Sequence, residues 1–121
     1  MVAVPAFLLR RLYVKGSLRN TPDGYQMQLK NSLGSGYAKG MLPLVVDGLE
    51  VPLEATSFQV DGTVTPFAAV SEQSPFTIAL NKLTTIAVRG PALGQGPHTL
   101  VIGFVVVGLG KLSFDVTDAL I

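Results

Sequence analysis

Histidine is the side chain best suited to acid–base chemistry near neutral pH, and this chain has a single one, His98. It follows a Gly-Pro pair, begins an apolar alternating run, and has no carboxylate within three residues on either side. A general base needs a group that orients it and a substrate proton within reach. The pattern therefore favours a structural role for His98 over a catalytic one.

The acidic residues are not spaced for paired chemistry. Asp115 and Asp118 lie in a predicted strand, where a spacing of three points their side chains to opposite faces. Glu50 and Glu54 flank a predicted edge hairpin, which is typical of solvated surface. One histidine without cysteine also falls short of the usual zinc ligand set. We therefore predict neither paired-carboxylate hydrolysis nor a metal site in this chain.

Two loops carry a G-x-G pattern, at 34–36 and 94–96, but neither follows a predicted strand and opens a helix. A phosphate cradle requires that context. The nucleophile elbow G-x-S-x-G is missing as well, although residues 33–36 resemble part of it. The absence of cysteine excludes thiolate catalysis and disulfides. We therefore assign no catalytic residue and no cofactor to this chain, and predict that it is not an enzyme by itself.

Composition points towards a partner protein. The chain is 48% hydrophobic and only 14% charged, where about 25% charged is usual. Because so few charged side chains can cover only a little of the surface, we expect part of that surface to be buried against another subunit. The nine basic residues are scattered and the net charge is +1, which argues against nucleic acid.

Membrane association is not predicted. The longest apolar stretch, 100–109, contains two glycines and is half the roughly 20 residues that a spanning helix needs. The apolar start of the chain lacks the charged region of a signal peptide. These features lead us to expect a cytoplasmic protein.

Three Asp-Gly pairs, at 23–24, 47–48 and 61–62, lie beside alternating apolar runs. Asp-Gly favours two-residue hairpin turns, because both residues tolerate positive φ. Pro22 favours a type I geometry at the first of these turns. We therefore predict that successive strands fold back antiparallel.

The predicted strands alternate with period two. Their expected core faces are Tyr25, Met27 and Leu29; His98, Leu100, Ile102, Phe104 and Val106; and Leu112, Phe114 and Val116. The predicted strands are residues 7–15 continuing through 17–20, then 25–29, 42–46, 49–53, 58–60, 63–65, 84–89, 98–107 and 111–117. Residues 68–70 fit either a helical turn or an edge strand, and residues 118–121 are expected to trail off.

About eight strands at 8–12-residue spacing, with no convincing amphipathic helix, predict an all-β fold. We expect one domain, residues 1–121, built as an antiparallel β-sandwich of immunoglobulin-like or jelly-roll-like type.

Residues 31–40 contain three glycines and no periodicity, which predicts a long loop. Within the segment 33–41, we single out Tyr37, Lys39 and Met41 as the partner- or substrate-facing residues. A disordered connection is the alternative interpretation of this segment.

A resemblance to a known family rests on the order of several motifs across residues 12–118. The motifs are Ser17–Asn20, Tyr37–Gly40, Val46–Pro52, Phe58–Gly62, Ile86–Pro91 and Gly96–Leu100. In this order they resemble the small (β) subunit of bacterial C-glycoside deglycosidases and their relatives. The chain departs from that pattern in having no tryptophan in 66–82, and Ala38-Lys39 where the family tends to show an arginine.

The resemblance implies a non-catalytic β-sandwich subunit of a lyase-type complex in carbohydrate metabolism. It implies a larger (β/α)-barrel partner that holds a divalent metal, typically manganese, and cleaves the carbon–carbon bond of oxidised C-glycosides. Two other hypotheses remain open at this point. One is a stand-alone β-sandwich that binds a carbohydrate or another ligand, and the other is a structural homo-oligomer subunit.

Overall fold

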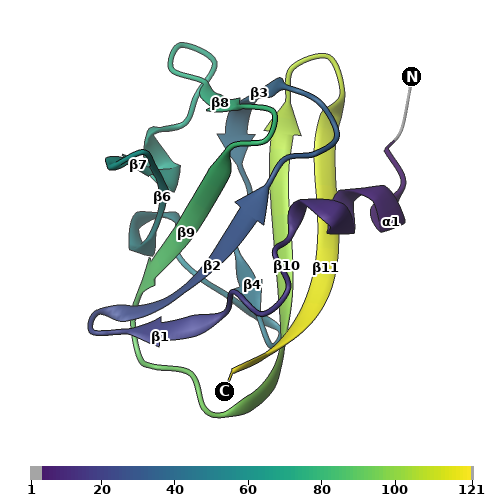
Figure 1. The fold of residues 1–121 in the computed structure, drawn as a ribbon. Coiled ribbons are helices and arrows are strands. Elements are labelled where there is room, and N and C mark those ends of the chain that lie inside the picture. The colour runs from purple at the N-terminus through teal and green to yellow at the C-terminus, as the bar shows by residue number, and fades with distance from the viewer. Residues whose placement is uncertain (1–3, 121) are drawn as a thin grey trace.

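The computed structural model describes residues 4–120, in which eleven strands form two sheets that face one another (Figure 1). Every pair of neighbouring strands is antiparallel. The prediction of an all-β antiparallel sandwich is therefore confirmed.

The first sheet has the strand order β1-β2-β9-β6-β7. Its strands are β1 (Arg19–Thr21), β2 (Gly24–Lys30), β9 (Leu83–Arg89), β6 (Thr56–Val60) and β7 (Thr63–Pro66).

The second sheet is organised around β10. One edge of this strand pairs with β11 over the whole length of β10. Its other edge pairs with β4 at the middle of the strand and with β3 near its end. The strands are β3 (Gly36–Met41), β4 (Val45–Val46), β5 (Leu49–Glu50), β8 (Phe76–Ile78), β10 (Gly96–Val106) and β11 (Gly110–Leu120). The run from His98, which is apolar on both faces, is therefore a central strand of this sheet.

The core lies between the two sheets and comes from the alternating faces that the sequence indicated. The predicted inward residues of β2 are all buried, as are the last four of the predicted face of β10. Phe58 stacks on Phe76 with ring centroids 3.9 Å apart, and Phe67 lies 4.5 Å from Phe58 on the other side. Phe67 belongs to η3 (Phe67–Ala69), so residues 68–70 begin as a helical turn and do not form an edge strand.

Two of the three Asp-Gly pairs form the predicted hairpin turns. Asp47 and Gly48 have φ of 51° and 84°, and Asp61 and Gly62 have φ of 50° and 82°. These values match the positive φ that a type I′ turn requires at both central residues. The β4–β5 and β6–β7 hairpins are therefore confirmed, with shorter arms than predicted at 42–53.

The first Asp-Gly pair behaves differently. Here Thr21 pairs with Gly24, so the turn residues are Pro22 and Asp23 and the glycine is already in β2. A Cβ at Gly24 would collide with the backbone carbonyl of Val88 on β9. Close approach of two backbones, rather than positive φ, therefore requires glycine at this position.

The predicted strand at 7–15 is wrong. Residues Ala6–Leu9 form the short helix α1 and Arg10–Leu12 the 3-10 helix η1. Leu9 and Leu12 are three apart, so one helical face buries both of them against the sandwich. Arg10 and Arg11 are both exposed and do not point to opposite faces of a sheet.

Strand segments were also missed, and one of them is the whole of β8, Phe76–Ile78. The predicted loop at 31–40 ends at residue 35, because Gly36–Met41 form β3. A register shift between Val105 and Val106 leaves Lys39 as the extra residue of a β-bulge, which breaks the alternation that marks a strand. The predicted tail also continues as β11, with Asp118 and Leu120 buried.

A last 3-10 helix, η2 (Leu53–Ala55), connects β5 to β6. Within residues 4–120, no helix combines the length and the apolar character needed to cross a bilayer.

Candidate functional site

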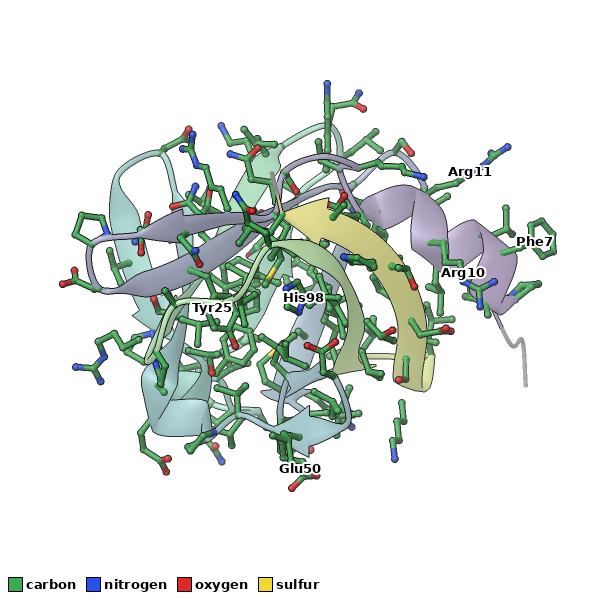
Figure 2. The ribbon with its side chains drawn as sticks, turned by 90° about the horizontal axis from the view of Figure 1, so that it is seen from below. Phe7, Arg10, Arg11, Tyr25, Glu50 and His98 are labelled. Carbon is green, nitrogen blue, oxygen red and sulfur yellow. The ribbon has the colours of Figure 1, made fainter. Side chains whose placement is uncertain are left out.

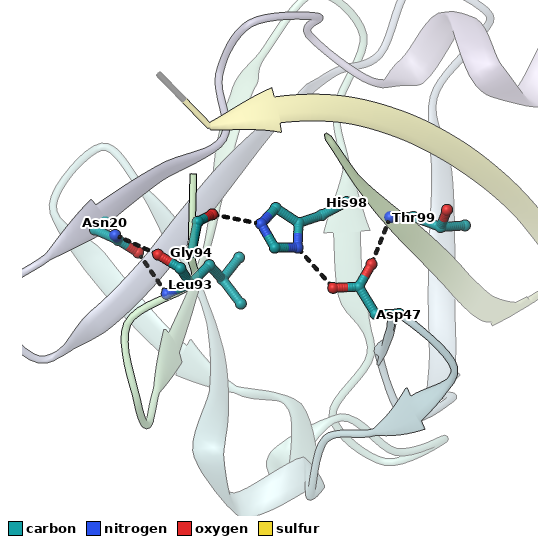
Figure 3. A network of polar contacts seen from close by, with 6 residues as sticks. All are labelled: Asn20, Asp47, Leu93, Gly94, His98 and Thr99. Atoms are coloured by element: carbon teal, nitrogen blue, oxygen red, sulfur yellow. Dashed lines mark hydrogen bonds and ion pairs between the residues drawn. The ribbon is translucent and has the colours of Figure 1, made fainter. Parts of the chain in front are cut away.

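His98 is the centre of a polar network at the end of the sandwich where β10 begins (Figure 3). Its Nδ1 lies 2.6 Å from Asp47 Oδ2, and its Nε2 lies 2.6 Å from the carbonyl oxygen of Gly94. The other oxygen of Asp47 accepts a hydrogen bond of 2.9 Å from the amide of Thr99. The ring therefore connects the β4–β5 turn to the connection between β9 and β10.

The network requires a protonated ring. A carboxylate and a backbone carbonyl both accept hydrogen bonds only, so both ring nitrogens must donate. The hydrogen bond to Asp47, followed by that to Gly94, raises the pKa of His98 above its ordinary value. The hydrogen bond from His98, followed by that from the Thr99 amide, lowers the pKa of Asp47. When the ring is protonated, the two groups form an imidazolium–carboxylate ion pair.

Two further titratable groups belong to strands beside this network. Tyr25 of β2 is buried, and burial followed by the negative charge of Asp47 raises its pKa. Figure 2 shows Tyr25 and His98 at the same end of the molecule, away from Phe7 on α1. Asp118 of β11 is directly opposite His98 in the ladder of the two strands.

Such an arrangement suits a structural ion pair better than a general base. A base must offer a free nitrogen to a substrate, whereas both nitrogens of His98 are engaged and its side chain is only 12% exposed. The structural role predicted for His98 agrees with this geometry. Sequence reasoning missed Asp47, because it lies 51 residues away and only the strand pairing brings it close.

Asp118 forms a second cluster that sequence reasoning missed. Its carboxylate accepts hydrogen bonds from the Tyr13 hydroxyl at 2.6 Å and from the amides of Gly16 and Leu18. Burial raises the pKa of Asp118, but these hydrogen bonds outweigh it and hold the pKa below its ordinary value. Burial, followed by the hydrogen bond to Asp118, raises the pKa of Tyr13. Asp118 thus fastens the segment after η1 to β11.

The three residues predicted to face a partner or substrate all belong to β3, but their side chains are not exposed alike. Tyr37 is 55% exposed, and Lys39 forms an ion pair of 3.6 Å with Glu72. Met41 is buried in the core, so its side chain is not available to a partner. The structure therefore keeps Tyr37 and Lys39 on the surface and removes Met41 from it.

The β2–β3 loop, the β8–β9 loop and the β10–β11 turn meet at one end of the sandwich (Figure 1), and five exposed large apolar residues belong to them or to the strand ends directly beside them. We name this set, Leu33, Tyr37, Leu80, Leu83 and Val107, the apolar end. Backbone contacts connect its parts: the amide of Val107 donates to the carbonyl of Tyr37, and the amide of Leu80 donates to Ser35 Oγ. A groove of about 250 Å³ runs from Leu33 between α1 and the β10–β11 hairpin.

The outer face of the first sheet carries a separate polar hollow of about 390 Å³. Its side chains include Gln26, Gln59 and Arg89, and the Arg89 guanidinium donates to the carbonyl of Glu54. None of the residues that line the hollow is aromatic. It therefore lacks the stacking platform on which sugar-binding sandwiches usually depend.

Within residues 4–120 there is no group of three or more His, Cys, Asp or Glu that could hold a metal ion.

Comparison with known proteins overturns the resemblance to C-glycoside deglycosidases. The family described as "Hydroxymethylglutaryl-CoA reductase, N-terminal domain" matches residues 8–121, nearly the whole chain. No curated protein matches the chain. Assignment to a deglycosidase subunit, with its lyase activity on C-glycosides, was therefore wrong. The barrel partner and its manganese were implied by that resemblance alone, and no observation of this chain bears on them. The chain belongs to the family of the hydroxymethylglutaryl-CoA reductase N-terminal domain.

Proposed function

We propose that this chain is an accessory domain that docks, through its apolar end, onto the catalytic part of a hydroxymethylglutaryl-CoA reductase. The observation that carries this proposal is that five exposed apolar side chains lie on or directly beside three neighbouring loops at one end of the sandwich. Contiguous exposed apolar surface commonly marks a protein interface. The family description names an N-terminal domain of a reductase, which supports a catalytic polypeptide as the occupant.

The apolar end is held in place before any partner arrives. Asn31 is buried, and its side-chain amide donates to the carbonyls of Gly34 at 2.6 Å and Ile78 at 3.1 Å. Its side-chain oxygen accepts from the amides of Leu33 and Gly34. A single side chain thus fixes the β2–β3 loop and ties it to the end of β8. Pre-organisation of this kind lowers the entropic cost of binding.

Charge around the apolar end indicates the character of the partner surface. Lys30 ends β2 and Lys111 lies at the start of β11, and neither forms an ion pair within residues 4–120. Lys82 and Lys39 also lie nearby but are paired with Asp61 and Glu72. We therefore expect an apolar partner surface with an acidic rim, and binding that weakens as salt increases.

The proposal includes a cytoplasmic location. The absence of cysteine is compatible with the reducing conditions of that compartment.

The test mixes the purified full chain with the purified catalytic polypeptide of a hydroxymethylglutaryl-CoA reductase from the same genome. Size exclusion with light scattering should give a species with the summed mass of the two. The double substitution Leu80→Ser and Val107→Ser should weaken binding at least about tenfold, because apolar anchors dominate interface energies. The matched control is Leu49→Ser, since Leu49 is the most exposed of the large apolar residues but lies outside the apolar end.

Two outcomes would overturn the proposal. One is a chain that stays separate from the reductase at tens of micromolar, or a complex that Leu49→Ser weakens as much as the double substitution does. The other is a chain that forms a dimer by itself through the apolar end, because a second copy would then occupy the surface assigned to the reductase.

A further inference from the structure

His98 holds together two segments that belong to different parts of the chain (Figure 3). Asp47 is in the β4–β5 turn, and Gly94 is in the connection 90–95 between β9 and β10. We propose that His98 is a proton-operated latch: the doubly protonated ring holds the connection against the turn, and loss of one ring proton releases the connection at Gly94.

The geometry explains which contact breaks. Both ring nitrogens lie 2.6 Å from an atom that can only accept a hydrogen bond. A neutral imidazole has a single N–H, so one of the two contacts then places the lone pair of a ring nitrogen against the lone pair of an oxygen, which is repulsive. The carboxylate of Asp47 is the stronger acceptor because it is charged. The remaining proton therefore stays on Nδ1, and the contact with Gly94 is lost.

The connection can respond to this loss because, within residues 4–120, the contact with His98 is the only hydrogen bond that holds Gly94 or Gln95. Leu93, directly before them, is tied by Asn20, whose side chain exchanges two hydrogen bonds of 2.9 Å with the Leu93 backbone. Those bonds involve neutral groups and do not change with pH. Gly94 is exposed, and the ladder of β10 with β11 holds the backbone again only from Gly96. We therefore expect release to be confined to the segment around Gly94 and Gln95.

The titratable groups nearest the ring are Asp47 from the β4–β5 turn, Asp118 from β11 opposite His98, and Tyr25 from β2. Asp47, whose pKa is lowered, favours the imidazolium. The carboxylate of Asp118 is occupied by the Tyr13 hydroxyl and two backbone amides, and the pKa of Tyr25 is raised, so that residue adds no charge. The connection contributes only its neutral carbonyl at Gly94.

The direction of the pH dependence follows from the raised pKa of His98. A raised pKa in the folded state means that the closed latch stabilises the fold fully below about pH 6.5, the ordinary value for histidine. That contribution is lost as the pH rises through the higher, folded-state pKa. The latch is therefore closed below the folded-state pKa of His98 and opens as the pH rises through it.

The first test uses the unsubstituted chain. His98 is its one histidine, so every histidine imidazole signal in the NMR spectrum comes from this residue. The Hε1 signal of the full chain should titrate with a midpoint above pH 6.5. The amide signals of Gly94 and Gln95 should shift with the same midpoint, and their hydrogen exchange should become faster above it. A midpoint at or below pH 6.5 would contradict the proposal. Amide signals of Gly94 and Gln95 that do not change as His98 titrates would contradict it as well.

Asp47→Asn is the informative variant. Asparagine tolerates the φ of 51° at this turn and keeps an oxygen for the Thr99 amide, but it removes the negative charge. The midpoints of His98 and of the connection should fall together by about one pH unit. The matched control is Asp61→Asn, an aspartate in the same kind of Asp-Gly turn with a φ of 50° that pairs with Lys82. An equal fall in both variants, or none in Asp47→Asn, contradicts the latch.

Discussion

Asp118 shows how much a single buried carboxylate can organise. It receives hydrogen bonds from the Tyr13 hydroxyl and from the amides of Gly16 and Leu18, so removing its charge weakens three long-range contacts at once. We expect Asp118→Asn to lower the free energy of unfolding by about 1–3 kcal/mol at pH 7. Urea unfolding of both proteins measures this difference.

The pH dependence of the same comparison has a defined sign. Because the folded-state pKa of Asp118 is lowered, its contribution is present above the ordinary value of about 3.9 and is lost as the pH falls through the folded-state pKa. The difference between the wild type and Asp118→Asn should therefore shrink below about pH 4. A difference that stays constant down to pH 2 would mean that the carboxylate charge does not hold this segment.

The sequence could have revealed part of this residue-level organisation. The inward face of β11, Leu112, Phe114 and Val116, continues with the same period to Asp118 and Leu120, so an inward carboxylate was visible in the pattern. Its partners were not visible, because they lie 100 or more residues away. Long-range polar contacts depend on how the sheets pair, which no local period encodes.

At the scale of elements, two buried glycines differ in what surrounds them. A Cβ at Gly24 would meet the backbone of Val88, whereas a Cβ at Gly103 would lie 2.6 Å from Leu42 Cδ1, the far end of a flexible side chain. We expect Gly24→Ala to cost about 3 kcal/mol or more and Gly103→Ala about 1 kcal/mol. Thermal unfolding followed by circular dichroism compares them, and equal losses would refute the role of the β2–β9 approach.

Hairpins were the elements most readily predicted, because local turn chemistry and alternation suffice to specify them. The Asp47-Gly48 and Asp61-Gly62 turns both formed with the expected positive φ. The failures have local causes of their own. Residues 7–15 are rich in Leu, Tyr and Val, which suggested a strand, although Leu9 and Leu12 are spaced for one helical face. The bulge at Lys39 hides the period of β3.

At the scale of the whole molecule, the same local physics explains why the family was misjudged. Asp-Gly turns and a strand that begins after Gly-Pro are what any hairpin-rich sandwich needs. Their order therefore identified the class of fold and not the family, which only the match over residues 8–121 supplied. The apolar end was hidden for a related reason, since its five residues come from three separate parts of the chain.

The apolar end and the His98 latch lie at opposite ends of the sandwich (Figure 1). His98 and Val106 both belong to β10, and at about 3.3 Å per residue they lie roughly 25 Å apart along the strand. Sites this far apart with no shared partners usually contribute additively. We therefore expect Asp47→Asn to leave the affinity for the reductase unchanged, and Val107→Ser to leave the titration of His98 unchanged.

The measurement combines both substitutions in one chain and compares it with each single variant. Binding affinity should equal that of Val107→Ser, and the His98 midpoint should equal that of Asp47→Asn, each within experimental error. A double variant whose affinity changes with the protonation of His98 would show that the two ends are coupled through β10. In that case the strand would act as a two-state element, and docking would depend on pH.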